Sequence, residues 1–443
     1  MPPQGAASND ELSTAIGQAR ALSSSLAPTS TRWQRAVVLD ERRAVLIGEV
    51  VNETIALFTD NAGRTWHSLR LERDGWSTWS IGADGAAVVA IGPRALPQQL
   101  LKDPRNPAPL ADPLRLYFAA FDATQLTAPS AVMLPKRSPT AKLPVDLAPA
   151  VLSAERAALV IEEAPRRSVL LYSGVSGAEP IPTVKLPPFE QALPTPYGRP
   201  PMLLTTRGRD LLVRPVPEPG KPLTPPEKVA GIVVTPALAA QLAAMPICEI
   251  EGWSLQLVKQ AKDTIVAISP QKTTTFPLPA KAAQGAAPGC GAGRIAVEID
   301  DPMPPDPSDP LAAQKLRVTT LALCPLDAPC VVPQKPPFRP WLEPHEQSMA
   351  AVPTSQGAVA LLTERASARW GLYLAHSQDG GKVFEVPRVI GEGLGDRGRI
   401  ELGALLSFGS RILMILEADV TGTSRRGWYV TASEDGGLSW NAP

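Results

Sequence analysis

The chain has 443 residues and no net charge, because 43 basic side chains balance 43 acidic ones. This balance argues against broad electrostatic capture of nucleic acid or of an anionic membrane, so we expect no nucleic-acid partner. No apolar run reaches the roughly 20 residues that a membrane-spanning helix needs. Proline accounts for 50 residues, which predicts many loops and few long helices.

Residues 1–30 form a polar segment rich in Ala and Ser, which we separate from the rest of the chain. Apolar residues from Leu12 to Leu22 approach helical spacing, so a short amphipathic helix ending near Ser25 is one interpretation. A frayed N-terminal tail is the other interpretation. Residues 31–443 are predicted to form a single domain.

Short β-rich runs recur along this domain. We divide them into seven groups, at residues 32–71, 76–135, 145–186, 201–278, 294–332, 348–389 and 400–443. The fourth group is the least clear, and Pro236–Ala244 is predicted to form a short helix within it. Groups of about 40 to 80 residues are too small to bury their own faces and must pack against their neighbours.

Three stretches of eight residues share one pattern, and each follows a β-rich run. They are Thr59–Trp66 (TDNAGRTW), Ser377–Phe384 (SQDGGKVF) and Ser433–Trp440 (SEDGGLSW). A short Asx side chain accepts hydrogen bonds from backbone N–H groups ahead of it and closes a turn. Glycine supplies the positive φ that a tight turn needs, and the final aromatic residue buries its ring beneath the hairpin. The pattern predicts three repeated hairpin corners.

These stretches resemble the Asp-boxes of the BNR/sialidase-like β-propeller families. The resemblance implies an all-β propeller, for which we expect seven four-stranded blades, with six or eight as alternatives, and with Pro-rich loop insertions. The residues expected to build the boxes are Thr59, Asn61, Gly63, Thr65, Trp66, Ser377, Asp379, Gly381, Phe384, Ser433, Asp435, Gly437, Ser439 and Trp440.

The resemblance also implies an exported protein, because proteins of this kind are often periplasmic, cell-surface or extracellular. The even number of cysteines agrees with export. The first ten residues lack the basic start and the apolar run of a signal peptide, so we expect the signal sequence to be absent from this chain. A cytoplasmic location is the alternative.

Pro-rich insertions at Pro93–Pro113, Pro215–Pro226 and Asp301–Pro310 are predicted to fall between the second and third strands of their blades. The boxes fall between third and fourth strands, so the two sets of loops should lie on opposite faces of the ring. Binding residues concentrate on long loops held by a rigid scaffold. We therefore expect a partner to bind the loop-rich face. Stiff spacers without a ligand are the other interpretation of these loops.

Cys324 and Cys330 lie where the fifth group would carry its box. Two cysteines that flank a hairpin turn can reach each other, so we predict a Cys324–Cys330 disulfide. Cys248 and Cys290 are then left to pair with each other. No spacing typical of a zinc site is present, and we predict neither a metal nor a cofactor.

The sialidase site is not recognisable in the sequence. Such a site would need three arginines, a Tyr–Glu pair, an acid/base Asp and an F/Y-R-I-P motif early in the chain. Phe338-Arg339-Pro340 lacks the isoleucine and lies late, and no tyrosine is convincingly placed against a glutamate. We therefore assign no catalytic residue.

The first functional hypothesis is a non-catalytic, exported scaffold that binds a protein or glycan partner. The alternative is a glycan-processing hydrolase with two carboxyl groups about 5–10 Å apart in the central pocket. A third possibility is an assembly component whose Pro-rich loops dock neighbouring subunits.

Overall fold

The structure of the chain is a computed structural model. It describes residues 20–23, 26–72, 77–82, 84–92, 114–132, 149–164, 167–175, 184–187, 191–194, 197–198, 202–235, 247–250, 253–258, 263–268, 273–282, 289–300, 319–326, 328–334, 346–355, 357–366, 369–394, 400–420 and 425–441. In these ranges the regular secondary structure is entirely β, as predicted.

The described strands form eight small sheets, which we number in chain order. Sheets 1 to 4 are β2–β5 (Arg32–Val38, Ala44–Val50, Glu53–Thr59, His67–Glu72), β6–β9 (Ser77–Gly82, Ala87–Ile91, Leu114–Ala119, Ser130–Val132), β10–β13 (Ala150–Ser153, Arg156–Ala164, Arg167–Gly174, Val184–Lys185) and β14 with β16–β18 (Gln191–Pro194, Met202–Arg207, Asp210–Pro215, Glu227–Val233). Sheets 5 to 8 are β19–β22 (Ile247–Ile250, Trp253–Val258, Thr264–Ile268, Thr273–Pro277), β23–β25 (Gly289–Gly291, Arg294–Asp300, Thr319–Pro325), β26–β29 (Glu346–Pro353, Ala358–Ala366, Arg369–Ser377, Arg388–Leu394) and β30–β32 (Ile400–Phe408, Arg411–Val420, Arg425–Ser433).

Two short strands join sheets that lie far away in the sequence. β1 (Arg20–Ala21) pairs with β32 and becomes the outer strand of sheet 8, so the N-terminal segment completes the last sheet. β15 (Tyr197–Gly198) pairs in parallel with β6 of sheet 2. All other strand pairs are antiparallel.

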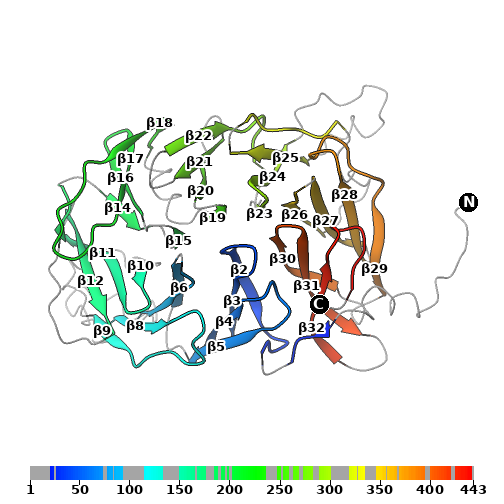
Figure 1. The fold of residues 1–443 in the computed structure, drawn as a ribbon, viewed down its shortest axis with the longest axis horizontal. Helices are drawn as coiled ribbons and strands as arrows, with labels where there is room; N and C mark the ends of the chain where they lie inside the picture. Colours follow the sequence, from blue (N-terminus) through cyan, green and yellow to red (C-terminus); the bar gives the residue numbers. More distant parts are fainter. Residues whose placement is uncertain are drawn as a thin grey trace, which may run out of the picture.

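The sheets stand around a common axis and, apart from the added strands β1 and β15, the first strand of each sheet is innermost and the last is outermost (Figure 1). Eight apolar clusters of buried residues hold them together, and each cluster lies between two neighbouring sheets. The cluster between sheets 8 and 1 closes the circle through Leu46 and Ile55 of sheet 1 and Leu413 and Val430 of sheet 8. The arrangement is therefore a β-propeller.

The strand sequences explain this packing. In β3, Leu46 joins the cluster toward sheet 8, whereas its neighbours Val45 and Ile47 join the cluster toward sheet 2. Successive side chains of a strand point to opposite faces, and both faces are buried here. The middle strands are therefore continuously apolar rather than alternating, which is the pattern of a sheet covered on both sides. Each fully buried Leu or Ile contributes about 1.5–3 kcal/mol to the hydrophobic term.

The strand groups predicted from the sequence differ from the structure in three places. The strand β23 (Gly289–Gly291) precedes the fifth predicted group, and β29 extends to Leu394, beyond the end of the sixth group at residue 389. Residues 201–278, interpreted as one group, form strands of two sheets, 4 and 5, so the described sheets number eight, which was an alternative to the seven expected first. The short strands β14 and β19, which begin these sheets, were not predicted, and no corner motif separates the two sets. The predicted helix Pro236–Ala244 lies outside the described residues. So does the predicted N-terminal helix up to residue 19, but Arg20–Ala21 is a strand rather than its continuation.

One Pro-rich insertion was also placed wrongly. Pro215–Pro226 connects β17 to β18, the third and fourth strands of sheet 4, and not the second and third. It therefore lies at the same end of its sheet as the hairpin corners do in theirs, because the corners also follow the third strands of their sheets. The other two insertions connect second and third strands as predicted, although their residues lie outside the described ranges.

Candidate interaction surface

Three hairpin corners follow the third strands of sheets 1, 7 and 8, and we call Thr59–Trp66 corner one, Ser377–Phe384 corner two and Ser433–Trp440 corner three. In corner three, the Ser433 hydroxyl donates to Asp435 Oδ1 (2.8 Å) and accepts the N–H of Gly437 (2.6 Å). The Asp435 carboxylate accepts the backbone N–H (2.9 Å) and the hydroxyl (2.6 Å) of Ser439. The first, third, fifth and seventh residues thus form one closed relay.

Corner two repeats this relay. The Ser377 hydroxyl donates to Asp379 Oδ1 (2.9 Å) and accepts from the N–H of Gly381 (3.0 Å), while Asp379 also accepts the N–H groups of Lys382 and Val383. These hydrogen bonds lower the pKa of Asp379, and the bond from the backbone N–H of Val383 has the largest effect. For Asp435, burial works to raise the pKa, but the hydrogen bonds from Ser439 and Ser433 prevail and lower it to about 2.

Corner one uses the same geometry with an uncharged Asx residue. Thr59 Oγ1 donates to Asn61 Oδ1 (3.1 Å) and accepts the N–H of Gly63 (2.8 Å), and Asn61 Oδ1 accepts the N–H of Thr65 (2.9 Å). Because an amide performs the same task as the two carboxylates, the corner needs a hydrogen-bond acceptor and not a charge. The corner residues therefore have a structural role.

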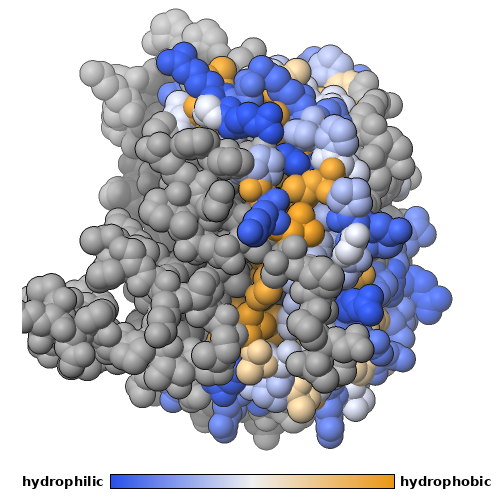
Figure 2. Space-filling view, turned by 90° about the vertical axis from the view of Figure 1, so that its left-hand side faces the viewer, coloured by the Kyte–Doolittle hydropathy of each residue, from blue (hydrophilic) through white to orange (hydrophobic). Residues whose placement is uncertain are grey.

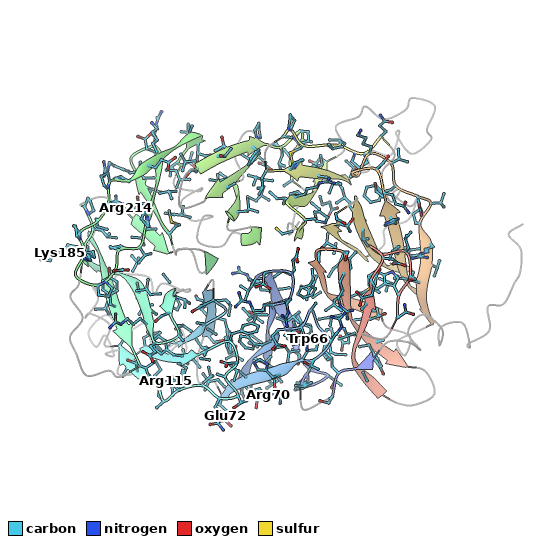
Figure 3. All side chains as sticks on the ribbon, viewed as in Figure 1. Trp66, Arg70, Glu72, Arg115, Lys185 and Arg214 are labelled. Atoms are coloured by element: carbon cyan, nitrogen blue, oxygen red, sulfur yellow. A yellow bond between two sulfur atoms is a disulfide. The ribbon has the colours of Figure 1, made fainter. Side chains whose placement is uncertain are left out.

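Each corner also packs on the preceding sheet. Gly63, Gly381 and Gly437 have φ of 82°, 88° and 102°, and a β-carbon on any of them would overlap a side chain of the preceding sheet. The final aromatic residues extend this contact. Phe384 is fully buried in the cluster between sheets 6 and 7. Trp66 and Trp440 pack against the clusters that separate sheet 8 from sheet 1 and sheet 7 from sheet 8. Figure 3 shows Trp66 on the side of sheet 1 that faces sheet 8.

A cluster of charged side chains crosses the junction between the last and first sheets. Arg411 of β31 is buried, donates its Nε–H to the carbonyl of Ala62 in corner one (2.8 Å), and pairs with Glu434 in corner three. Arg64 of corner one also reaches Glu434 (3.4 Å). Burial is the main cause that lowers the pKa of Arg411, and the positive charge of the nearby Arg64 lowers it further. These contacts join the two corners where the ring closes.

Exposed apolar side chains gather on one part of the circumference, which we call the β29 rim and define as corner two, residues 385–394 and corner three. Among the described residues, six large hydrophobic side chains are strongly exposed, and four of them lie in this rim. The four are Val383, Val386, Val389 and Leu438, with Val386 exposed at 74%. Arg388 binds the rim together, because its guanidinium donates to the carbonyls of Gly437 (2.8 Å) and Leu438 (2.5 Å).

The opposite side of the ring differs. Figure 2 shows the side formed by β11, β12, β14 and β16–β18, where hydrophobic areas lie between hydrophilic side chains. Among the described residues of sheets 3 and 4, Val233 is the one large hydrophobic side chain that is strongly exposed, at 55%. The β29 rim is therefore the main concentration of exposed apolar side chains in the described part of the chain.

The predicted cysteine pair Cys324–Cys330 is confirmed as a disulfide, with a Cα–Cα distance of 4.0 Å. It lies directly after the third strand of sheet 6, where Leu323 and Val331 form a bridge, so it occupies the place of a corner. Cys290 is disulfide-bonded as well, but the side chain of Cys248 lies outside the described residues, and the Cys248–Cys290 pairing remains a prediction.

The functional candidates that the sequence analysis missed are the three valines of the rim, Leu438 and Arg388. Val386 and Val389 resemble buried strand residues in sequence, but Val386 lies in the connection before β29 and Val389 on the outermost strand of sheet 7. The loop-rich face that we predicted for a partner is not tested, because Pro93–Pro113 and Asp301–Pro310 lie outside the described residues. No group of three or more potential metal ligands occurs in the described ranges. Within the same ranges, no helix has the length and apolar character to cross a membrane.

Comparison with known proteins shows likeness in fold only. No family model and no curated protein matches the chain. A prolyl endopeptidase structure is 10% identical with a TM-score of 0.42, and the match covers 93% of this chain and 57% of that one, so this chain spans little more than half of the peptidase. The β-propeller domain of the Trilobed protease from Pyrococcus furiosus is 8% identical over 93% of this chain and 97% of that chain, with a TM-score of 0.33.

A structure of YCF48 bound to D1 peptide is 10% identical over 93% of this chain and 94% of that one, with a TM-score of 0.40. Likeness at this level carries no argument about function. The functional argument therefore depends on the surface of this chain itself.

Proposed function

We propose that this chain is a non-catalytic β-propeller of the Asp-box kind that acts as a scaffold and binds a protein partner through the β29 rim. The observation that supports this proposal is the concentration of four of the six strongly exposed large hydrophobic side chains of the described residues in one rim. A concentration of this kind marks a protein interaction site more often than single exposed residues do.

The chemistry of the rim favours a protein over a glycan. Its exposed large hydrophobic side chains are three valines and a leucine, and its aromatic residues Phe384 and Trp440 are fully or partly buried against the ring. The carboxylates of Asp379 and Asp435 already accept hydrogen bonds within their own corners. The aromatic and corner carboxylate groups that the rim could offer a glycan are therefore already engaged within the ring. The Cys324–Cys330 disulfide further supports an exported protein.

A matched pair of variants tests the proposal. The rim variant carries Val386→Lys and Val389→Lys, and the control variant carries Val51→Lys and Val233→Lys, two exposed valines outside the rim. Each full-length protein is used to capture partners from the secreted fraction of its source cells, and recovery is measured by quantitative mass spectrometry.

We expect a partner that the wild type and the control variant retain and the rim variant loses. Equal recovery by all three proteins would refute the proposal. Release of a fluorogenic sugar from model glycosides by the purified chain would instead support the hydrolase alternative.

A further inference from the structure

We propose that β29 binds its partner by strand addition, taking up an extended, uncharged segment of the partner protein with small apolar side chains along its outer edge. This inference rests on the proposed function and specifies its binding mode. Among the described strands, β29 pairs only with β28 and is the last strand of sheet 7. An outermost strand presents backbone N–H and C=O groups that an additional strand can pair with.

The side chains at the start of β29 flank this edge on both faces. Arg388 pairs with Leu374, which belongs to the apolar cluster between sheets 7 and 8, so Arg388 lies on the face toward sheet 8. Val389 pairs with Tyr373 and therefore lies on the other face. Leu438 is beside Arg388 on the first face and is 42% exposed, and Val389 is 50% exposed.

This arrangement distinguishes between two ways of binding. A partner that covers one face of sheet 7 would cover either Val389 or Leu438. A strand added at the edge of β29 contacts both, because its own side chains alternate between the two faces. The positions of the exposed side chains therefore favour strand addition over docking on a face.

Other outermost strands carry charges that discourage such pairing. Figure 3 shows Arg70 and Glu72 at the outer edge of β5 and Lys185 at that of β13. On β18, Lys228 forms an ion pair with Asp210 at 2.6 Å. In β29, by contrast, the guanidinium of Arg388 is held against corner three by the carbonyls of Gly437 and Leu438. The exposed Val389 of β29 therefore follows an exposed arginine whose guanidinium is bound at corner three.

The neighbouring charges indicate the chemistry of the partner segment. Lys382, Glu385 and Arg388 are exposed beside the three valines of the rim. Because the guanidinium of Arg388 is held by two carbonyls of corner three, the charges left to face a partner are one basic and one acidic side chain, and they do not favour either sign of charge on the partner. An uncharged segment of valine- and threonine-like residues fits this edge, because such residues favour extended backbone and match the size of the exposed valines.

The test uses a fluorescent, end-blocked peptide of seven alternating threonines and valines with the full-length chain. A second peptide has the same sequence but carries an N-methyl group on every residue, and therefore cannot donate backbone hydrogen bonds from either edge. Affinities are measured by fluorescence anisotropy, and amide hydrogen exchange is measured for residues 388–394. The variants are Val389→Lys and, as a control on another outermost strand, Val233→Lys.

We expect the N-methylated peptide to bind at least about tenfold more weakly, because several backbone hydrogen bonds are lost. Val389→Lys should weaken binding of the unmodified peptide similarly, and Val233→Lys should not. Exchange at residues 388–394 should slow only with the unmodified peptide. Equal affinity of the two peptides, or no binding at the highest soluble concentration, would overturn strand addition.

Two further outcomes separate this inference from the proposed function. If the rim variant loses its partner but the two peptides bind equally, the scaffold function stands and strand addition is wrong. If the chain alone dimerises in light scattering and Val389→Lys abolishes the dimer, the occupant of the edge is a second copy of this chain, and the heterologous segment proposed here is wrong.

Discussion

The contact between each corner and the preceding sheet predicts a specific difference between two adjacent glycines, Gly436 and Gly437. Both have positive φ, of 72° and 102°, so alanine at either position is strained by about 1–2 kcal/mol. A β-carbon on Gly436 would meet no atom within 4 Å, whereas one on Gly437 would overlap Cγ2 of Val359. Val359 is fully buried in sheet 7.

Overpacking of such a site typically costs a further 1–3 kcal/mol or so. We therefore expect Gly436→Ala to lower the free energy of unfolding by about 1–2 kcal/mol. Gly437→Ala should lower it by about 2–5 kcal/mol, the sum of the strain and the overlap. Urea denaturation followed by tryptophan fluorescence measures both values, and equal m-values show that the comparison is valid.

The difference in unfolding free energy between the two variants measures the packing between sheets 7 and 8 separately from backbone strain. Equal destabilisation by the two substitutions would show that corner three does not pack on sheet 7 as described. Greater destabilisation by Gly436→Ala would contradict the geometry of the corner itself.

Three further predictions concern the corners and their surroundings. Ser433→Ala leaves the buried N–H of Gly437 without its acceptor, so unfolding in urea should show a loss of about 1–3 kcal/mol, and wild-type stability would contradict the relay. Replacing Cys324 and Cys330 by alanine frees a seven-residue loop in the unfolded chain and should cost about 2 kcal/mol in thermal unfolding; an unchanged melting temperature would contradict this. Burial lowers the pKa of His376 in the folded chain below its ordinary 6.5, although Glu385 acts in the opposite direction. The stability that His376 contributes is therefore present above pH 6.5 and is lost as the pH falls through the pKa of the folded state. His376→Gln should reduce that pH dependence in denaturation series between about pH 7 and pH 5, and an unchanged slope would argue against this origin.

The corners and most strand groups were accessible from the sequence because their signals are local. A hydroxyl, an Asx side chain and a glycine within five residues determine the corner relay almost by themselves, as the hydrogen bonds of Ser377, Asp379 and Gly381 show. The continuous apolar runs of the middle strands follow from burial on both faces. The Cys324–Cys330 pair could be predicted for the same reason, since the two cysteines are only six positions apart in the sequence.

Features that depend on distant segments were not accessible. β1 has two residues, and pairing with Tyr429 and Val430, some 400 residues away, makes it a strand. The hydrogen bond from Leu22 N to the carbonyl of Trp428 extends this contact. No local pattern in a polar N-terminal segment indicates such a partner. The division of residues 201–278 into two sheets was missed for a similar reason, because β14 and β19 become strands through pairing with β16 and β20.

The rim was missed because exposure is a property of position in the ring. Val389 has the same residue type as many buried strand residues, and its exposure follows from its place on the last strand of sheet 7. The sequence analysis instead favoured the long Pro-rich loops. One of them, Pro215–Pro226, lies at the end of the ring that carries the corners, so loop length alone is a poor guide to a common binding face in this chain.

The internal use of the corner carboxylates restricts how the rim can recognise a partner. Asp379 and Asp435 accept several hydrogen bonds from their own corners, and the guanidinium of Arg388 is held by two carbonyls of corner three. These groups would have to break existing bonds to engage a partner, at a cost that new contacts of the same kind would barely recover. What the rim offers without such a cost is apolar side chains and the backbone edge of β29. Binding there should therefore depend weakly on ionic strength, since Arg388 is held by corner three and the other exposed charges beside the valines, Lys382 and Glu385, have opposite signs.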